Sequence, residues 1–164
     1  MIHVKSLEQS EHDLDFLTDM MYEAIHIPEN KPPKEELLNL PHIKKYSEGW
    51  GRKGDRAIIA FEGNFPVGAA WYRLFAENQK GYGYVDDKTP ELGIAVINKV
   101  RGKGIGNLLM EKLFETAYRD GYTALSLSVD PKNTQAVQLY KKLGFEQCDS
   151  SGTSWTMICN VSSS

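Results

Sequence analysis

The spacing of apolar side chains along the chain predicts a succession of strands and helices. An apolar period near 3.6 residues predicts a helix, and alternation or a short apolar run predicts a strand. The first half of the chain is thereby predicted to contain a strand at 2–6, a helix at 14–25, a second helical stretch from 34 towards 46 that Pro41 can break, and two antiparallel strands at 57–61 and 67–75. A polar and aromatic loop without periodicity follows at 77–90, and loops of this length are often functional.

The apolar pattern in the second half of the chain predicts a more regular order of elements. These are a strand at 91–96, a helix at 104–119, a strand at 125–129, a helix from Asn133 to Leu143, and a terminal hairpin with strands at 145–148 and 154–159. A strand, a helix and a second strand in succession imply a parallel pair joined by a right-handed crossover. We therefore expect one α/β domain over residues 1–164, of the α+β kind with a mixed sheet. It should have N-terminal antiparallel strands, a central parallel pair, about four helices and a C-terminal hairpin.

Size and charge narrow the class of protein. A chain of 164 residues suits one domain with a real core. Its formal net charge of −3 argues against a general nucleic-acid binder, which needs a clustered surplus of Lys and Arg. The start of the chain, Met1 to Ser6, lacks the apolar core of a signal peptide, and no later stretch approaches the roughly 20 apolar residues that span a bilayer. We expect a cytoplasmic protein with no membrane partner.

The cysteines and histidines do not suggest a metal site. Cys148 and Cys159 lack the CxxC spacing, and a hairpin turn centred on Ser151-Gly152 would not pair them. The four histidines are scattered without metal-ligand spacing. The sequence therefore predicts unbridged thiols and no metal.

A glycine-rich segment with two cations lies between the strand at 91–96 and the helix that follows. It consists of Arg101, Gly102, Lys103, Gly104, Ile105, Gly106 and Asn107. Glycines let backbone N–H groups approach a ligand closely, and the helix N-terminus adds partial positive charge. Together with the two full charges this pattern predicts a site for a di- or polyphosphate.

Two familiar phosphate-binding motifs fit this segment less well. A Walker A loop needs Ser or Thr after its Gly-Lys, whereas Gly104 follows Lys103 here. A Rossmann fingerprint needs a third glycine where Asn107 stands. Asp130, at the end of the next strand, is also further along than the usual ~20 residues. A Rossmann-like nucleotide-binding domain is therefore the weaker alternative.

The arginine followed by Gly-x-Gly resembles the pyrophosphate loop of the GNAT superfamily, the acyl-CoA-dependent N-acetyltransferases. The resemblance continues in Asn133, Ala136, Tyr140 and the run Leu143-Gly144-Phe145, which look like the second conserved segment of that family. It covers residues 91–145 well and the preceding elements loosely. The family commonly has a proline in the linker after the central strand, where this chain has residues 97–100 without one. The resemblance implies a GNAT-like fold whose central parallel strands are splayed at a bulge.

Acetyl-CoA is the acetyl donor that this resemblance implies. The backbone of Ile94, Ala95 and Val96 would then pair with the pantetheine arm, while the glycine segment and its two cations would hold the pyrophosphate. Gly93 is compatible with the bulge and equally with ordinary close packing. Asn133 would donate or accept a hydrogen bond to the cofactor, a role compatible with capping the helix that it precedes.

The resemblance also implies a general base, an oxyanion donor and a general acid. Glu91 matches a common base position, with Asp86 and Asp87 as alternates and a solvated strand-end carboxylate as the other interpretation. An amide from Ala95 or Val96 would stabilise the oxyanion. Tyr140 would protonate the leaving sulfur, although an isolated Tyr at this spacing would be a core residue.

The sequence does not identify the amine acceptor. In the family it binds between the first helices and the loop before the central strand, here residues 22–50 and 77–90. The aromatic and acidic side chains of that loop, including Tyr82 and Tyr84, could attract a cationic amine, whether a small molecule or a peptide. The alternative to an enzyme is a sensor module that binds acyl-CoA without turnover. Many relatives dimerise, and the sequence itself does not indicate the oligomeric state.

Overall fold

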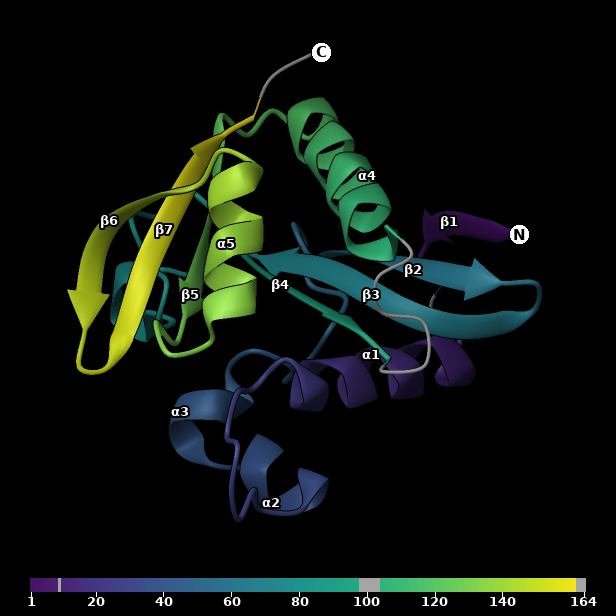
Figure 1. Ribbon diagram of the computed structural model, residues 1–164, viewed down its shortest axis with the longest axis horizontal. Coiled ribbons are helices and arrows are strands. Elements are labelled where there is room, and N and C mark those ends of the chain that lie inside the picture. The colour runs from purple at the N-terminus through teal and green to yellow at the C-terminus, as the bar shows by residue number, and fades with distance from the viewer. Residues whose placement is uncertain (9, 98–103, 162–164) are drawn as a thin grey trace.

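The computed structural model describes residues 1–8, 10–97 and 104–161. Arg101, Gly102 and Lys103, which we expect to bind phosphate, lie outside the described residues. Seven strands within the described ranges form one mixed sheet in the order β1-β2-β3-β4-β5-β7-β6 (Figure 1). The strands are β1 (Ile2–Ser6), β2 (Arg56–Glu62), β3 (Phe65–Arg73), β4 (Glu91–Val96), β5 (Ala124–Val129), β6 (Glu146–Ser151) and β7 (Ser154–Asn160).

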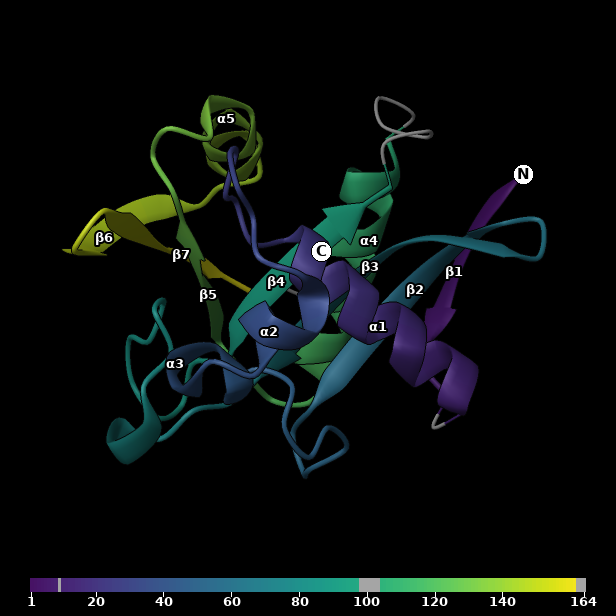
Figure 2. The same ribbon diagram turned by 90° about the horizontal axis from the view of Figure 1, so that it is seen from below.

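Helices cover both faces of this sheet (Figures 1 and 2). They are α1 (Glu11–Glu23), α2 (Lys34–Leu38), α3 (Pro41–Lys44), α4 (Ile105–Arg119) and α5 (Thr134–Lys142), with a short 3-10 helix η1 (Glu77–Gln79) in the long loop. Helices α1 to α3 lie on one side of the sheet, and α4 and α5 lie on the other. The expected second helix is two helices, because Pro41 at the first position of α3 lacks the N–H that would continue the turn before it.

Alternating side chains of β2 supply a separate core to each face. Ile58 and Ala60 pack with the apolar face of α4, whereas Ala57 and Ile59 pack with Leu17 and its neighbours on α1. This follows from the period of two along a strand, which sends successive side chains to opposite faces. The continuous apolar run predicted as a strand is therefore buried on both sides.

The central parallel strands separate almost as soon as they meet. β4 and β5 are parallel, and the register pairs only Glu91 with Ser126 in the described ladder. The splay that we expected is present. On its other side β4 pairs with β3 without a register shift from Arg73↔Glu91 to Gly68↔Val96, so the separation needs no bulge in β4.

Gly93 has a packing role in this arrangement. A Cβ built on Gly93 would lie 2.6 Å from the indole carbons of Trp71, a neighbour on β3. The close-packing interpretation of Gly93 is therefore the one that the structure supports, since only a residue without a side chain leaves room for Trp71. The alternative interpretation of this glycine, a bulge, is not seen in the β3–β4 register.

The terminal hairpin forms as predicted but is longer. β6 extends to Ser151, and Ser151 pairs with Ser154 across the turn. Cys148 and Cys159 are free thiols, as expected. None of the helices that the structure describes is long and apolar enough to cross a membrane.

Candidate active site

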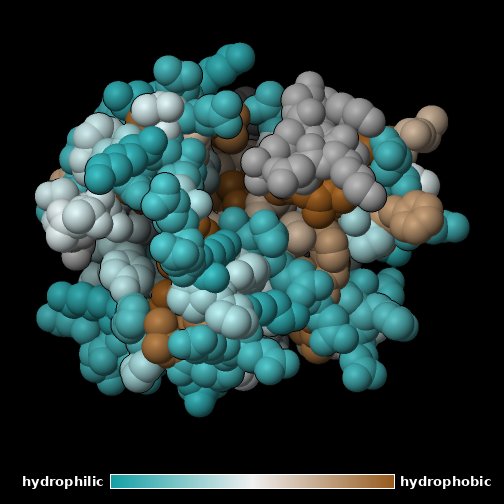
Figure 3. Space-filling view, turned by 60° about the horizontal axis from the view of Figure 1, so that its bottom comes forward, coloured by the Kyte–Doolittle hydropathy of each residue, from teal (hydrophilic) through white to brown (hydrophobic). Residues whose placement is uncertain are grey.

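A cavity of about 360 Å³ opens beside the splay between β4 and β5. Nine residues predicted from the sequence to bind the donor line it, although they come from three separate elements: Ile94, Ala95, Val96, Gly104, Ile105, Gly106, Asn107, Asn133 and Tyr140. Glu23, Ala24, Gln135, Ala136 and Leu139 complete the described lining. Figure 3 shows recessed apolar surface between hydrophilic rims on the side that carries α1 to α3.

The start of α4 offers backbone donors to this cavity. Gly104 precedes the helix in a left-handed conformation, with φ of 77°, and as a glycine it has no side chain to cap the first turn. The first N–H groups of a helix have no partner within the helix, so those of Ile105 to Asn107 are available to an anion. A Cβ on Gly106 would meet nothing closer than 3.9 Å, which leaves open space at this turn.

The backbone of β4 is also turned towards the splay at alternate residues. Ser126 N–H donates to the carbonyl of Pro90 on the β5 side, and Ile97 N–H donates to Val67 on the β3 side. Because backbone polar groups alternate in direction along a strand, the N–H and C=O of Ile94 point to the splay and those of Ala95 point to β3. Of these two residues, Ile94 is the one able to pair with a ligand lying between the strands.

Asn133 and Tyr140 come to the cavity on α5. The side chain of Asn133 caps this helix, accepting from Ala136 N–H at 3.4 Å. Tyr140 is half-buried, and its ring meets that of Phe145 edge-on at 5.8 Å between centroids. Burial raises the pKa of Tyr140 to about 12, so its phenol is protonated near neutral pH.

Glu91 does not line this cavity and is not a solvated strand-end carboxylate. It is the first residue of β4, only 6% exposed, and it faces the side of the sheet that carries α3. Its Oε2 accepts a hydrogen bond from the Tyr46 hydroxyl at 2.7 Å, and that hydroxyl in turn accepts from Tyr82 N–H at 2.6 Å. Oε1 is buried without a hydrogen-bond partner among the described residues.

The loop before β4 closes over this carboxylate. A Cβ built on Gly81 would overlap Oε1 of Glu91 and would lie 2.6 Å from the Tyr46 hydroxyl. Gly83 lies equally close to β5, because a Cβ there would be 2.6 Å from the carbonyl carbon of Leu127. These glycines allow the loop to pack directly against both strands.

Burial determines the acidity of Glu91. Loss of solvent raises its pKa to about 7, with smaller lowering contributions from the Tyr46 hydroxyl, the Gly83 backbone and the Lys45 ammonium. A carboxyl group with a pKa near 7 exchanges its proton readily at neutral pH, which suits a general base.

Tyr46 is held in place by a buried arginine. Arg73 forms two hydrogen bonds to the carboxylate of Asp55, at 2.9 and 2.7 Å, and both side chains are about 2% exposed. Its Nη1 amino group donates to the carbonyls of Lys45 and Glu48 at 2.9 and 2.7 Å. Arg73 therefore fixes the turn that carries Tyr46. No motif or periodicity in the sequence marks Tyr46 or Arg73 as part of a site.

The alternate bases are placed elsewhere. Asp86 and Asp87 are exposed and line no cavity described here. Asp86 closes its own turn by accepting from Lys88 N–H at 2.9 Å, and this hydrogen bond is the largest of the contributions that lower its pKa. Within the described ranges no cluster of three His, Cys, Asp or Glu side chains could hold a metal.

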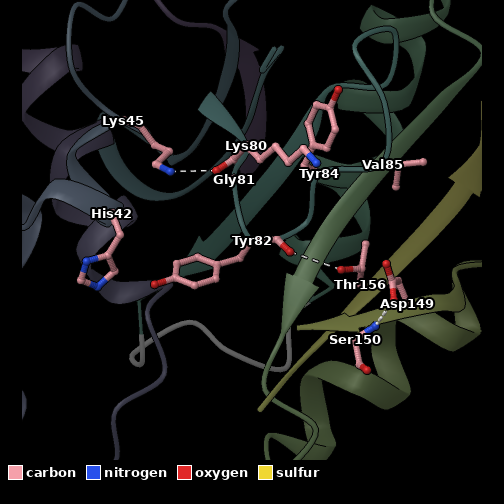
Figure 4. Close-up of a pocket in the computed structure, with 10 residues that line it drawn as sticks. All are labelled: His42, Lys45, Lys80, Gly81, Tyr82, Tyr84, Val85, Asp149, Ser150 and Thr156. Atoms are coloured by element: carbon pink, nitrogen blue, oxygen red, sulfur yellow. Dashed lines mark hydrogen bonds between the residues drawn. The ribbon is translucent and has the colours of Figure 1, made fainter. Parts of the chain in front are cut away.

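A second cavity, of about 500 Å³, lies on the other side of the loop that covers Glu91. Figure 4 shows its walls, which come from α3 and the turn after it, the loop and the terminal hairpin: His42, Lys45, Lys80, Gly81, Tyr82, Tyr84, Val85, Asp149, Ser150 and Thr156. The hairpin is tied to the loop where Thr156 Oγ1 donates to Tyr82 O at 3.2 Å.

Comparisons with known proteins agree with this geometry. The model of the Acetyltransferase (GNAT) family matches residues 16–145. The chain is 31% identical over 98 residues to the "Probable N-acetyltransferase san" of Drosophila melanogaster, covering 58% of this chain and 50% of that protein. The chain thus spans about half the length of this curated relative.

Solved structures share the fold at low sequence identity. The PaiA N-acetyltransferase of Thermoplasma acidophilum, in complex with coenzyme A, superposes with a TM-score of 0.68 at 20% identity, covering 98% of this chain and 99% of that one. The Salmonella typhimurium protein YncA, with acetyl-CoA, gives a TM-score of 0.71 at 16% identity, covering 100% and 96%.

Proposed function

Because the chain belongs to the acetyltransferase (GNAT) family, we propose that it moves an acetyl group from acetyl-CoA to a primary amine by direct attack in a ternary complex. The observation that carries this proposal is the cavity beside the splay of β4 and β5. It brings together a strand edge, a helix start preceded by glycine and a protonated phenol, from segments that lie far apart in the sequence.

The residues present fit coenzyme A. The first-turn amides of α4 suit its pyrophosphate, and the outward C=O of Ile94 suits an N–H of the pantetheine arm. Asn133 lines the same cavity and can bond the donor while it caps α5. PaiA and YncA, which share this fold, were crystallised with coenzyme A and acetyl-CoA. Arg101 and Lys103 would add charge at the pyrophosphate.

Glu91 would act as the general base. Bound acetyl-CoA supplies a thioester that an amine can attack. With a pKa of about 7, Glu91 is partly ionised near neutral pH and can take a proton from the acceptor amine, directly or through a water. Because the loop at Gly81 covers this carboxylate, the amine or the water must reach it past that glycine.

Ile94 and Tyr140 would complete the transfer. The amine nitrogen bonds to the acetyl carbon while the outward N–H of Ile94 stabilises charge on the acetyl oxygen. The carbon–sulfur bond then breaks, and Tyr140 gives its proton to the sulfur. The products are an N-acetyl amine and the free thiol of coenzyme A. Glu91 releases its proton to water and Tyr140 recovers one, so protons balance over a cycle.

A thiol-release assay tests this proposal. Acetyl-CoA is incubated with the protein and a panel of amines that includes polyamines, amino sugars, amino acids and peptides with free N-termini, and free thiol is measured. Thiol release that depends on both an amine and the protein is expected. Binding of acetyl-CoA without thiol release for any amine would instead indicate the sensor module. Absence of acetyl-CoA binding would contradict both interpretations.

A further inference from the structure

The second cavity, between α3, the loop and the terminal hairpin, has the form of a ligand site. Its volume of about 500 Å³ lies in the range of small-molecule pockets, and its walls combine aromatic faces with a few charged groups. Tyr82 and His42 meet edge-on at 6.1 Å between ring centroids, which gives one wall an aromatic surface. The donor cavity beside the β4–β5 splay shares no lining residue with it.

An unpartnered carboxylate oxygen lies immediately behind one wall. Gly81 lines the cavity, and a Cβ at that position would overlap Oε1 of Glu91. Oε1 is buried and accepts no hydrogen bond from a described residue. Gly81 therefore lies between the cavity and Oε1 of Glu91. The amine of an acceptor in this cavity would be separated from the proposed base by this glycine.

The charge of the cavity is positive, although the chain as a whole carries −3. Lys45 and Lys80 line it and form no ion pair with a described residue. The Lys45 ammonium donates to the carbonyl of Lys80 at 2.8 Å, and the Lys80 ammonium lies 5.4 Å from the centroid of the Tyr84 ring (Figure 4). Asp149 is the one acidic side chain among the described lining residues, and its Oδ1 accepts from Ser150 N–H at 2.8 Å.

We propose that this cavity binds the acceptor, and that the acceptor is a small amine that also carries an anionic group, a carboxylate or a phosphate, held by Lys45 and Lys80. This inference rests on the proposed acetyl transfer, because it assigns the amine to Glu91. Two ammonium groups that form no salt bridge with a described residue favour an anion over a second cation. A polyamine would bring a second positive charge against both lysines, so it is disfavoured.

Matched pairs of amines test the anionic group. γ-Aminobutyrate is compared with butylamine, and phosphoethanolamine with ethanolamine, so that each pair differs chiefly in the acid group. Spermidine and an amidated neutral tetrapeptide are the cationic and peptide arms. We expect kcat/KM for at least one acid-bearing amine to exceed that of its neutral counterpart by about tenfold or more, since charge-assisted hydrogen bonds are the strong ones. The pair that shows the larger ratio distinguishes carboxylate from phosphate.

A lysine variant tests whether the preference for acid-bearing amines arises in this cavity. Lys80→Met keeps the aliphatic stem and the backbone carbonyl that Lys45 bonds, and removes one exposed charge. It should lower the acid-to-neutral ratio about fivefold or more through a higher KM for the acid-bearing amine. Lys88→Met is the matched control, because Lys88 lies exposed in the same loop and does not line the cavity. It should leave the ratio within about twofold, since an exposed charge outside the cavity is screened by solvent and salt.

Three results would overturn the inference. Preference for spermidine or the neutral tetrapeptide would contradict the substrate class while leaving acetyl transfer intact. An equal effect of Lys80→Met on both members of a pair, or an equal effect of Lys80→Met and Lys88→Met, would remove the cavity from acceptor recognition. No thiol release with any amine would defeat the proposed function together with this inference.

Discussion

Tyr46 donates its phenolic proton to Oε2 of Glu91 across 2.7 Å, although 45 residues separate them in the sequence. The same hydroxyl accepts from Tyr82 N–H, so one side chain joins the turn after α3, the loop and the first residue of β4. A hydrogen bond to the ionised carboxylate lowers the pKa of Glu91, while burial raises it. Tyr46 therefore positions the proposed base and limits how far its pKa rises.

Tyr46→Phe should shift the pH dependence of turnover. Loss of the hydroxyl removes a group that favours the charged carboxylate, so the pKa of Glu91 should rise above about 7. The acidic limb of the profile of kcat/KM against pH should then move to higher pH, with KM for acetyl-CoA nearly unchanged. A lower rate with an unmoved profile would mean that Tyr46 has only a structural role.

Glu91→Gln should lower activity and, at high pH, increase stability. We expect kcat to fall about 10²- to 10⁴-fold, because the amide cannot accept the amine proton.

The stability of the wild type should also depend on pH through Glu91. The pKa of Glu91 in the folded protein, about 7, exceeds the ordinary 4.5, so the folded protein retains a proton that the unfolded chain releases between these values. Stability of the wild type should thus fall as pH rises from 4.5 to above 7, by about 3 kcal/mol.

Denaturation of the Gln variant at two pH values measures this effect. Near pH 4 the variant and the wild type should have similar free energies of unfolding, because Glu91 is protonated in both states. Near pH 8 the variant should be the more stable one. Equal stability at both pH values would show that Glu91 is not held in a buried site.

Tyr140→Phe should lower kcat about 10²-fold while acetyl-CoA binds normally, if the phenol protonates the leaving sulfur. Tyr118→Phe is the control, because Tyr118 is an exposed residue of α4 that does not line the cavity. Calorimetry with acetyl-CoA and steady-state rates supply the two readouts. Unchanged turnover in the Tyr140 variant would remove this residue from the mechanism.

Arg73→Met should destabilise the protein by about 3–5 kcal/mol, because it leaves the buried carboxylate of Asp55 without its partner. Arg56→Met is the matched control. Arg56 pairs with Asp120 at 2.8 Å, but its side chain is 54% exposed, so the change should cost about 0–1 kcal/mol. Urea denaturation compares the two variants, and equal losses would contradict the structural role of Arg73.

The local pattern predicted most of the elements and part of the site. Apolar periodicity located β4, α4, β5 and α5 to within a few residues, because side-chain direction depends on the backbone period alone. The break at Pro41 followed from covalent chemistry. The residues of the donor cavity lie within short segments of the sequence, and the resemblance to the GNAT superfamily was what predicted their grouping.

The tertiary structure decided the properties of Glu91. Sequence placed it at the start of a strand, but its burial depends on Gly81 and Tyr46, which reach it from other parts of the chain. Tertiary packing also decided between the two interpretations of Gly93, since the space beside it is occupied by Trp71 of a neighbouring strand.

The sequence by itself thus determined most helices and strands to within a few residues, and it predicted which short segment offers backbone donors to a phosphate. Only the fold decided that a carboxylate at the end of a strand is enclosed and titrates near 7. Periodicity and capping act within a few residues, whereas desolvation sums the effects of every atom that packs around the group, wherever it lies along the chain.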